Sequence, residues 1–94
     1  MGALEIIRLN ASSIRGGYHL RRIGVFGSCI RGENTSRSDV DVLVEFEPGY
    51  ETFDNYMELK YRLEALVGSK VDLVTADALK PQLRDIILNE VAYA

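Results

Sequence analysis

The segment 39–46 reads DVDVLVEF, and its alternation of apolar and acidic residues constrains the fold more than any other part of the chain. Successive side chains of a strand point to opposite faces, so the valines line one face and Asp39 and Asp41 the other. An apolar strand face has to be buried against a second layer. We therefore predict a strand over residues 40–46, within a sheet that helices cover.

The neighbouring segments carry the same kinds of signal. Apolar residues recur every three or four positions over residues 3–15, 53–67 and 81–91, which predicts three helices. Short apolar runs predict further strands over residues 20–26 and 71–75. The order helix, strand, strand, helix, strand, helix, with a brief helical turn expected near residues 28–31, is typical of an α/β or α+β fold.

Glycine, threonine and proline define the expected helix ends. We expect the first helix to stop at Gly16 and Gly17, and the second to run from a Thr52 cap to Gly68. Pro81 suits the first position of the last helix. That helix is expected to turn four apolar side chains inward: Leu83, Ile86, Ile87 and Val91.

The composition sets limits on the class of protein. With 94 residues the chain builds one domain, residues 1–94. Its net charge of −3 argues against strong nucleic-acid binding on its own. The single Cys29 excludes an internal disulfide and is expected to be a small buried residue. The chain lacks the pattern of a signal peptide and any membrane-length apolar run, so we expect a cytoplasmic protein.

The aspartates carry the first sign of chemistry. Asp39 and Asp41 share a strand face, where two ionised carboxylates repel each other, and a divalent cation removes that repulsion. Mg²⁺ prefers carboxylate oxygens and shares them with substrate phosphates. Asp72 lies in the apolar run of residues 71–75 and would sit beside the pair if the two strands are neighbours. Three carboxylates from two strands would suffice for two metal ions.

Gly27 and Ser28 have the character of a phosphate site at the end of the first strand. Glycine lets the backbone approach an anion closely, and a short helix starting at Ser28 would direct N–H groups toward it. Arg31 and Arg37 suit phosphate recognition, and a solvated surface position is an equal alternative for both. A nucleoside triphosphate on Mg²⁺ would bridge the glycine and the aspartates.

Simpler interpretations exist for several of these residues. Asp39 and Asp41 could serve only as turn and cap residues neutralised by an arginine, but their combination with Gly27-Ser28 and Asp72 favours the metal site. His19 is expected to be a half-exposed side chain, and Glu45 a surface residue with a minor claim to metal binding. Three aromatic residues could form a partner surface or stack on a base, although a core position is favoured for them: Tyr50, Phe53 and Tyr56.

The pattern of these residues resembles the nucleotidyltransferase superfamily of the DNA polymerase β type. It consists of Gly27-Ser28, ten further residues, Asp39-Val40-Asp41 and the later Asp72. The fuller spelling FGSCIRGENTSRSDVDVLVEF, with GSKVDLVT downstream, is similar to the minimal nucleotidyltransferase (MNT) family. The resemblance spans residues 23–91 and the KPQLRDIILNEVAYA tail.

The resemblance implies a single mixed sheet of about three or more strands with a catalytic cleft at one end. Asp39 and Asp41 would hold two Mg²⁺ ions, Asp72 would hold the ion that activates the acceptor hydroxyl, and Gly27 and Ser28 would grip the β- and γ-phosphates of ATP or another nucleoside triphosphate. MNT proteins resemble antitoxins of HEPN-type RNase toxins, and some transfer AMP to a toxin tyrosine. The implied function is a protein adenylyltransferase that modifies such a partner.

Two alternatives remain beside the enzyme. In the first, a non-catalytic module neutralises its partner by contact alone. Homo-oligomerisation stays open for either function. A response-regulator phosphoacceptor domain also uses an acidic Mg²⁺ pocket. It is disfavoured because such domains are longer, and because Asp39 and Asp41 stand at the start of a strand rather than at the carboxyl ends of parallel strands.

Overall fold

The computed structural model describes residues 2–27 and 39–94. It contains the helices and strands α1 (Ala3–Tyr18), β1 (Leu20–Phe26), β2 (Val40–Phe46), α3 (Phe53–Val67), β3 (Val71–Thr75), the 3₁₀ helix η1 (Ala76–Ala78), α4 (Pro81–Glu90) and β4 (Ala92–Tyr93). The strands β1, β2 and β3 have the predicted bounds, and the expected brief helical turn near residues 28–31 lies outside the described residues.

The strands form one mixed sheet in the order β3-β2-β1-β4. β1 pairs antiparallel with both β2 and β4, and β2 pairs parallel with β3. The predicted single mixed sheet is thereby confirmed, and so is the expectation that the second and third strands are neighbours.

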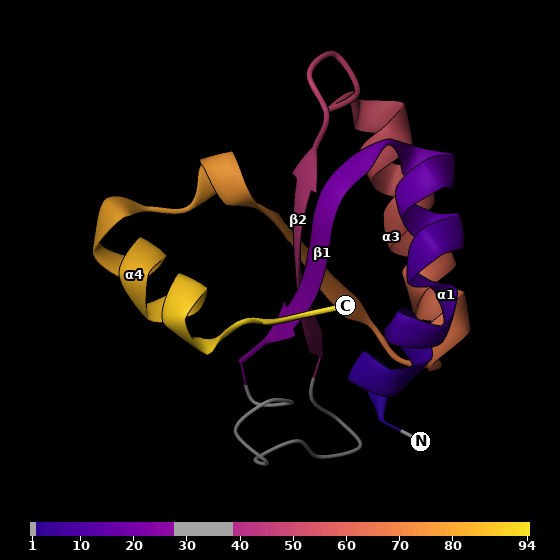
Figure 1. Ribbon diagram of the computed structural model, residues 1–94, viewed down its shortest axis with the longest axis horizontal. Coiled ribbons are helices and arrows are strands. Elements are labelled where there is room, and N and C mark those ends of the chain that lie inside the picture. The colour runs from indigo at the N-terminus through magenta and orange to yellow at the C-terminus, as the bar shows by residue number, and fades with distance from the viewer. Residues whose placement is uncertain (1, 28–38) are drawn as a thin grey trace.

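Helices α1 and α3 cover one face of the sheet (Figure 1). The strands present alternate residues to these helices, and every second side chain of β2 is buried among them, as the alternation of residues 39–46 predicts. The core formed in this way consists of Ile7, Ile14, Leu20, Ile23, Val25, Val40, Val42, Val44, Phe46, Leu59, Leu63, Val71 and Leu73.

The first helix is longer than predicted. Gly16 and Gly17 do not end α1, which continues to Tyr18. The left-handed residue that terminates it is His19, with φ 57°, whose N–H donates to the Arg15 carbonyl. The Asn55 side chain of α3 donates a hydrogen bond of 2.9 Å to the Tyr18 carbonyl. Tertiary contacts thus hold the last turn in place and outweigh the helix-breaking tendency of two glycines.

Helix α3 has the predicted ends. The Thr52 hydroxyl accepts a hydrogen bond of 3.2 Å from the Asn55 N–H, and Gly68 adopts a left-handed conformation with φ 71°. A side-chain acceptor at the start and a left-handed glycine at the end are the usual means of satisfying the terminal backbone groups of a helix.

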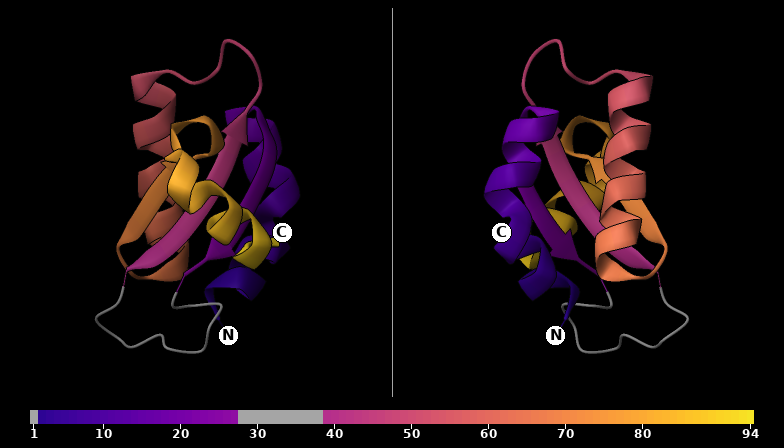
Figure 2. Two further views of the ribbon diagram at one scale, coloured as in Figure 1. Left: turned by 90° about the vertical axis from the view of Figure 1, so that its left-hand side faces the viewer. Right: turned by 90° about the vertical axis from the view of Figure 1, so that its right-hand side faces the viewer.

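The last helix begins at Pro81 as predicted. The expectation that four apolar side chains turn inward is wrong for Leu83 and Ile86, whereas Ile87 and Val91 are half-buried. Leu83 and Ile86 are 46% and 59% exposed, and α4 has no buried residue. The helix ends before Val91, and the next residues form β4 on the edge of β1. The chain is attached to the sheet through β4, and the body of α4 lies on the face opposite α1 and α3, set apart from the strands in Figure 1 and in front of them in the left view of Figure 2.

The expected core position of three aromatic residues is also wrong in part. Phe53 is 77% exposed and Tyr50 43% exposed, while Tyr56 is half-buried and donates a hydrogen bond to the Leu73 carbonyl. His19 is half-exposed, as expected, and stacks on the Tyr50 ring at 3.8 Å between centroids. In the described part of the chain, no helix combines the length and apolar character needed to span a bilayer.

Candidate active site

One edge of the sheet brings together the residues singled out from the sequence. Because β1 is antiparallel to β2, the end of β1 meets the start of β2, and Phe26 pairs with Asp41. Because β3 is parallel to β2, its start lies at the same edge, and Asp72 is the direct partner of Asp41. Gly27 follows β1 at this edge. The glycine and the two strand aspartates therefore converge although 45 residues separate the first from the last.

Hydrogen bonds hold the starts of both acidic strands in register. The Val40 N–H donates to the Lys70 carbonyl at 2.9 Å, and the Val71 N–H donates to Oε2 of Glu64 on α3 at 3.0 Å. Each bond lies one residue before a strand aspartate. The backbone positions of Asp41 and Asp72 are consequently fixed by the ladder and by α3.

The two strand aspartates lie on the sheet face opposite the core. Their neighbours Val40, Val42 and Val71 are buried against α1 and α3, so Asp41 and Asp72 project toward the side of α4. Asp41 is half-buried, whereas Asp39 and Asp72 are exposed. The face is thus acidic at this edge, with Asp41 the most enclosed of the three carboxylates.

Gly27 fits between two acidic side chains. It adopts a left-handed conformation with φ 78°, and a Cβ atom added to it would overlap Oδ2 of Asp41 and lie 3.0 Å from its Cγ. Any other residue here would collide with the Asp41 carboxylate and strain the backbone. The Gly27 N–H donates a hydrogen bond to Oε1 of Glu90. Glycine is therefore required at this position by close packing as well as by conformation.

Carboxylates arranged in this way suit a hard divalent cation. Asp41 and Asp72 offer oxygen ligands from adjacent strands, with Asp39 two residues before Asp41, and Mg²⁺ commonly binds one or two carboxylates together with substrate phosphates. Within residues 2–27 and 39–94, no three acidic, histidine or cysteine side chains gather closely enough to enclose a metal ion by themselves. The donor set thus fits an ion that takes the rest of its ligands from a bound nucleotide and water.

Several predicted site residues lie outside the described residues. Ser28, Arg31 and Arg37, the candidate phosphate ligands, fall in the segment 28–38, as does Cys29. Their roles stay predictions.

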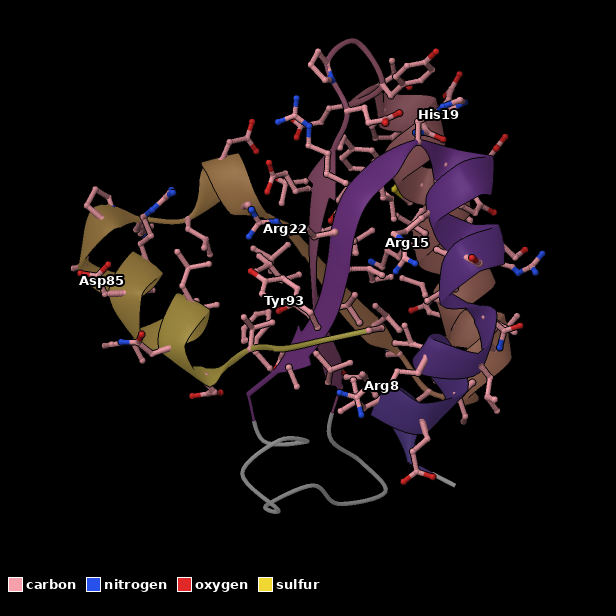
Figure 3. All side chains as sticks on the ribbon, in the orientation of Figure 1. Arg8, Arg15, His19, Arg22, Asp85 and Tyr93 are labelled. Carbon is pink, nitrogen blue, oxygen red and sulfur yellow. The ribbon has the colours of Figure 1, made fainter. Side chains whose placement is uncertain are left out.

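Glu45 shares the face of Asp41, as the alternation predicts, but it has other partners. Its carboxylate lies 3.6 Å from Nη1 of Arg21 and 3.7 Å from Nε of Arg22, and Arg22 lies over the Tyr93 ring at 5.7 Å (Figure 3). These contacts neutralise Glu45 near the far end of β2. They favour the surface role that was expected over metal binding.

A cleft of about 290 Å³ opens at the opposite end of the strands and is lined by Glu45, Phe46, Glu51, Ala76, Asp77 and Arg84. Partial desolvation, together with the negative charge of Asp77 and a hydrogen bond to it, raises the pKa of Glu51. The cleft lies at the carboxyl ends of β2 and β3, whereas Asp41 and Asp72 are near their amino ends. It is therefore separate from the acidic edge.

Glu90 is a residue of this edge that sequence reasoning missed. It is the last residue of α4, half-buried, and reaches the site across 63 residues of sequence to accept from Gly27. The end of α4 is placed by the strand β4 that follows it. A strand of two residues is too short to give a periodic pattern, so the sequence did not reveal this attachment.

Comparison with known proteins agrees with this geometry. Residues 7–94 match the nucleotidyltransferase domain family. The protein adenylyltransferase MntA of Thermococcus cleftensis is 42% identical over 89 residues, which cover 95% of this chain and 89% of that relative. Nucleotidyltransferases of this type typically use divalent metal ions.

Solved structures share the fold. A chain assigned as a minimal nucleotidyltransferase superposes with a TM-score of 0.80 at 38% identity, covering 98% of this chain and 95% of its own length. The complex of a tri-AMPylated HEPN toxin of Shewanella oneidensis with an MNT antitoxin gives a TM-score of 0.66 at 20% identity, covering 96% of this chain and 70% of that one. The second likeness concerns the fold alone. The matched family and the 42% identical relative show that the chain belongs to the nucleotidyltransferase domain family, in its minimal, MNT form.

Proposed function

We propose that the chain is a Mg²⁺-dependent protein adenylyltransferase that transfers AMP from ATP to a hydroxyl group of a HEPN-type partner in the cytoplasm, and so acts as its antitoxin. The observation that carries the proposal is the packing of Gly27 against Asp41, with Asp72 as the direct strand partner of Asp41. Its support is the 42% identity to a protein adenylyltransferase and the fold shared with an MNT antitoxin in complex with an AMPylated HEPN toxin.

The three aspartates are the metal ligands in this proposal. Asp39 and Asp41 would hold two Mg²⁺ ions, and Asp72 would complete the site from the neighbouring strand. When bound, the ions neutralise the charge on the phosphate oxygens and assist the attacking and leaving oxygens. The half-buried Asp41 is best placed to stay ordered without the ions, because Gly27 packs against it.

Residues around Gly27 bind the nucleotide. Ser28, Arg31 and Arg37 are the proposed ligands of the β- and γ-phosphates. The Gly27 N–H already donates to Glu90, so the contribution of Gly27 is a close approach of the backbone rather than a free donor. The phosphates therefore depend on the donors that follow Gly27 in the chain.

The reaction is an in-line displacement at the α-phosphorus. The acceptor oxygen forms a new bond to phosphorus, the bond to the bridging oxygen of pyrophosphate breaks, and the acceptor loses its proton. Asp72 is more exposed than Asp41, so the acceptor would approach from the side of β3. Position and electrostatics are the main contributions of a protein to this kind of chemistry.

One observation also favours contact neutralisation as a second candidate function. The exposed apolar residues Leu83 and Ile86 of α4 would suit a chain that inhibits its partner by binding alone. In that case the acidic edge would be a nucleotide-binding feature without transfer.

Intact-mass spectrometry of the partner separates the two functions. The chain would be incubated with ATP, Mg²⁺ and the product of the adjacent gene, and each other nucleoside triphosphate would be tried in turn. We expect the partner to gain the mass of one or more AMP groups, with no gain when Mg²⁺ is omitted. Asp39→Asn and Asp41→Asn are expected to abolish transfer while the chain stays folded, because each substitution removes a metal ligand and keeps the size of the side chain.

Asp85→Asn is the matched control, since Asp85 lies on α4 away from the sheet (Figure 3). It is expected to transfer AMP at the normal rate. A stable complex without any mass gain would move the assignment to contact neutralisation. Full activity of folded Asp39→Asn and Asp41→Asn would refute the metal site.

A further inference from the structure

We propose that Glu90 is a positioning residue of the transfer reaction, which holds Gly27 against the carboxylate of Asp41. The inference rests on the proposed function and adds a role for Glu90, which lies in the KPQLRDIILNEVAYA tail but to which no sequence pattern assigns a function. Three independent features of the structure carry it: an anchored chain segment, a hydrogen bond and a close packing contact.

The segment that follows Glu90 is anchored to β1. Ala92 pairs with Val25, Tyr93 pairs with Gly24, and the Ala94 N–H donates to the Ile23 carbonyl at 2.8 Å. Helix α1 adds a hydrogen bond of 3.1 Å from Arg15 Nη1 to the Ala94 carbonyl (Figure 3). The end of α4 is thus fixed to the sheet although the body of the helix buries no residue.

Gly24 brings this segment unusually close to β1. A Cβ atom on Gly24 would lie 2.7 Å from Cγ2 of Val91 and 2.9 Å from the Ala92 carbonyl oxygen. Side chains do not tolerate such distances, so the absence of a Cβ atom sets the spacing between β1 and β4. Val91 follows Glu90 directly, and its position determines where the Glu90 side chain starts.

From that position Glu90 accepts the hydrogen bond of the Gly27 N–H. A carboxylate acceptor makes a stronger bond to a backbone N–H than a neutral one does. Gly27 is buried, so its amide N–H has exchanged water for the Glu90 carboxylate. Removing Glu90 would take away that acceptor at a buried position, which is costly. Glu90 therefore fixes the direction in which the chain leaves β1.

Gly27 in turn confines Asp41. The absent Cβ atom of Gly27 would occupy the place of Oδ2 of Asp41, so the carboxylate lies directly against the glycine. A shift of Gly27 would open space around Asp41 and allow its carboxylate to rotate. Since small displacements of reacting groups cost large factors in rate, Glu90 would act on the reaction through Gly27 and Asp41.

The test compares Glu90→Ala with Glu90→Gln, which keeps an acceptor oxygen at the same reach. We expect kcat for AMP transfer to the HEPN-type partner to fall about 10- to 100-fold in Glu90→Ala, as for other residues that orient metal ligands. The KM for ATP should change far less, and Glu90→Gln should restore most of kcat. Asp85→Ala, which removes a carboxylate from the same helix, should behave as the unmodified chain.

A second measurement does not depend on activity. Hydrogen exchange of the Gly27 amide, followed by NMR at the molecular mass of 10.5 kDa, should accelerate in Glu90→Ala and stay slow in Glu90→Gln. Melting temperatures of both variants show whether the fold is retained, and Glu90→Gln keeps the test valid if Glu90→Ala unfolds.

Several outcomes would overturn the role of Glu90. These are a normal kcat in folded Glu90→Ala, no difference between the Gln and Ala variants, or unchanged Gly27 exchange. A fall in the KM for ATP would also overturn it, because Glu90 would then be occupying the place of a phosphate. Absence of transfer by the unmodified chain would instead refute the proposed function itself.

Discussion

The two faces of the sheet differ in what they contribute. The face under α1 and α3 is closed by side chains such as Ile7, Ile23, Leu59 and Leu63, which have no exposed surface. The face toward α4 carries Asp41, Glu45 and Asp72 around the buried Leu43, and no residue of α4 itself is buried. One face thus provides most of the free energy of unfolding, while the other positions charged groups on a rigid support.

Strand β2 shows how one short segment serves both faces. Val40, Val42 and Val44 anchor it in the core, while Asp41 and Glu45 project from the other face beside the buried Leu43. Because the anchored side is fully buried, a one-residue slip of register would expose the valines and bury the acids. The packing of the core therefore fixes the register of β2, and with it the position of Asp41.

The strongest test of this comparison removes a side chain from the closed face. Leu63→Ala, at a fully buried position of α3, is expected to lower the free energy of unfolding by about 2–5 kcal/mol. Urea denaturation followed by circular dichroism measures it. Below the unfolding transition, transfer of AMP should remain close to normal. A loss under about 1 kcal/mol would mean that the closed face is not the main source of stability.

The next test perturbs the pairing of β4 with β1, which attaches the end of α4 to the sheet. Gly24→Ala places a methyl group against Val91 and the Ala92 carbonyl, and overpacking of this kind costs about 1–3 kcal/mol. We expect β4 to separate from β1, with faster hydrogen exchange at Ala94, whose N–H donates to Ile23. AMP transfer should fall as well, because Glu90 would lose its position. Gly16→Ala is the matched control, since nothing lies within 4 Å of the added carbon.

The smallest effect is expected on α4 itself. Ile86→Ala truncates a side chain that is 59% exposed, so the free energy of unfolding of the isolated chain should change by less than about 0.5 kcal/mol. The same urea measurement would detect a larger change, which would show that α4 packs on the sheet in solution. Compared with Leu63→Ala, this variant measures the difference between the two faces directly.

Strands and aspartates were predictable for the same reason. Alternation over residues 39–46 defines both the buried valines and the face of Asp41, and it holds because one side of β2 is packed. The adjacency of Asp41 and Asp72 required only that β2 and β3 be neighbours, which the structure confirms. Local patterns thus captured the acidic edge.

Features that depend on distant contacts were missed. The end of α1 is set by Asn55 of α3 rather than by Gly16 and Gly17. The apolar spacing of α4 predicts a buried face, but β4 holds the segment at the edge of β1 and leaves Leu83 and Ile86 in solvent. Glu90 reaches Gly27 only through that attachment, so no local pattern could assign it to the site.

The pairing of β4 with β1 has a consequence for the order of events in folding. It joins residues 24 and 25 to residues 93 and 92, and the bond from Gly27 to Glu90 spans 63 residues of sequence. Contacts between such distant segments form late, because the entropy of closing the loop opposes them until other elements have brought the ends together. During synthesis β4 also leaves the ribosome after β1, β2 and β3. The contact of Glu90 with Gly27 would therefore form last, and a chain in which Glu90 holds Gly27 against Asp41 would be one that has finished folding.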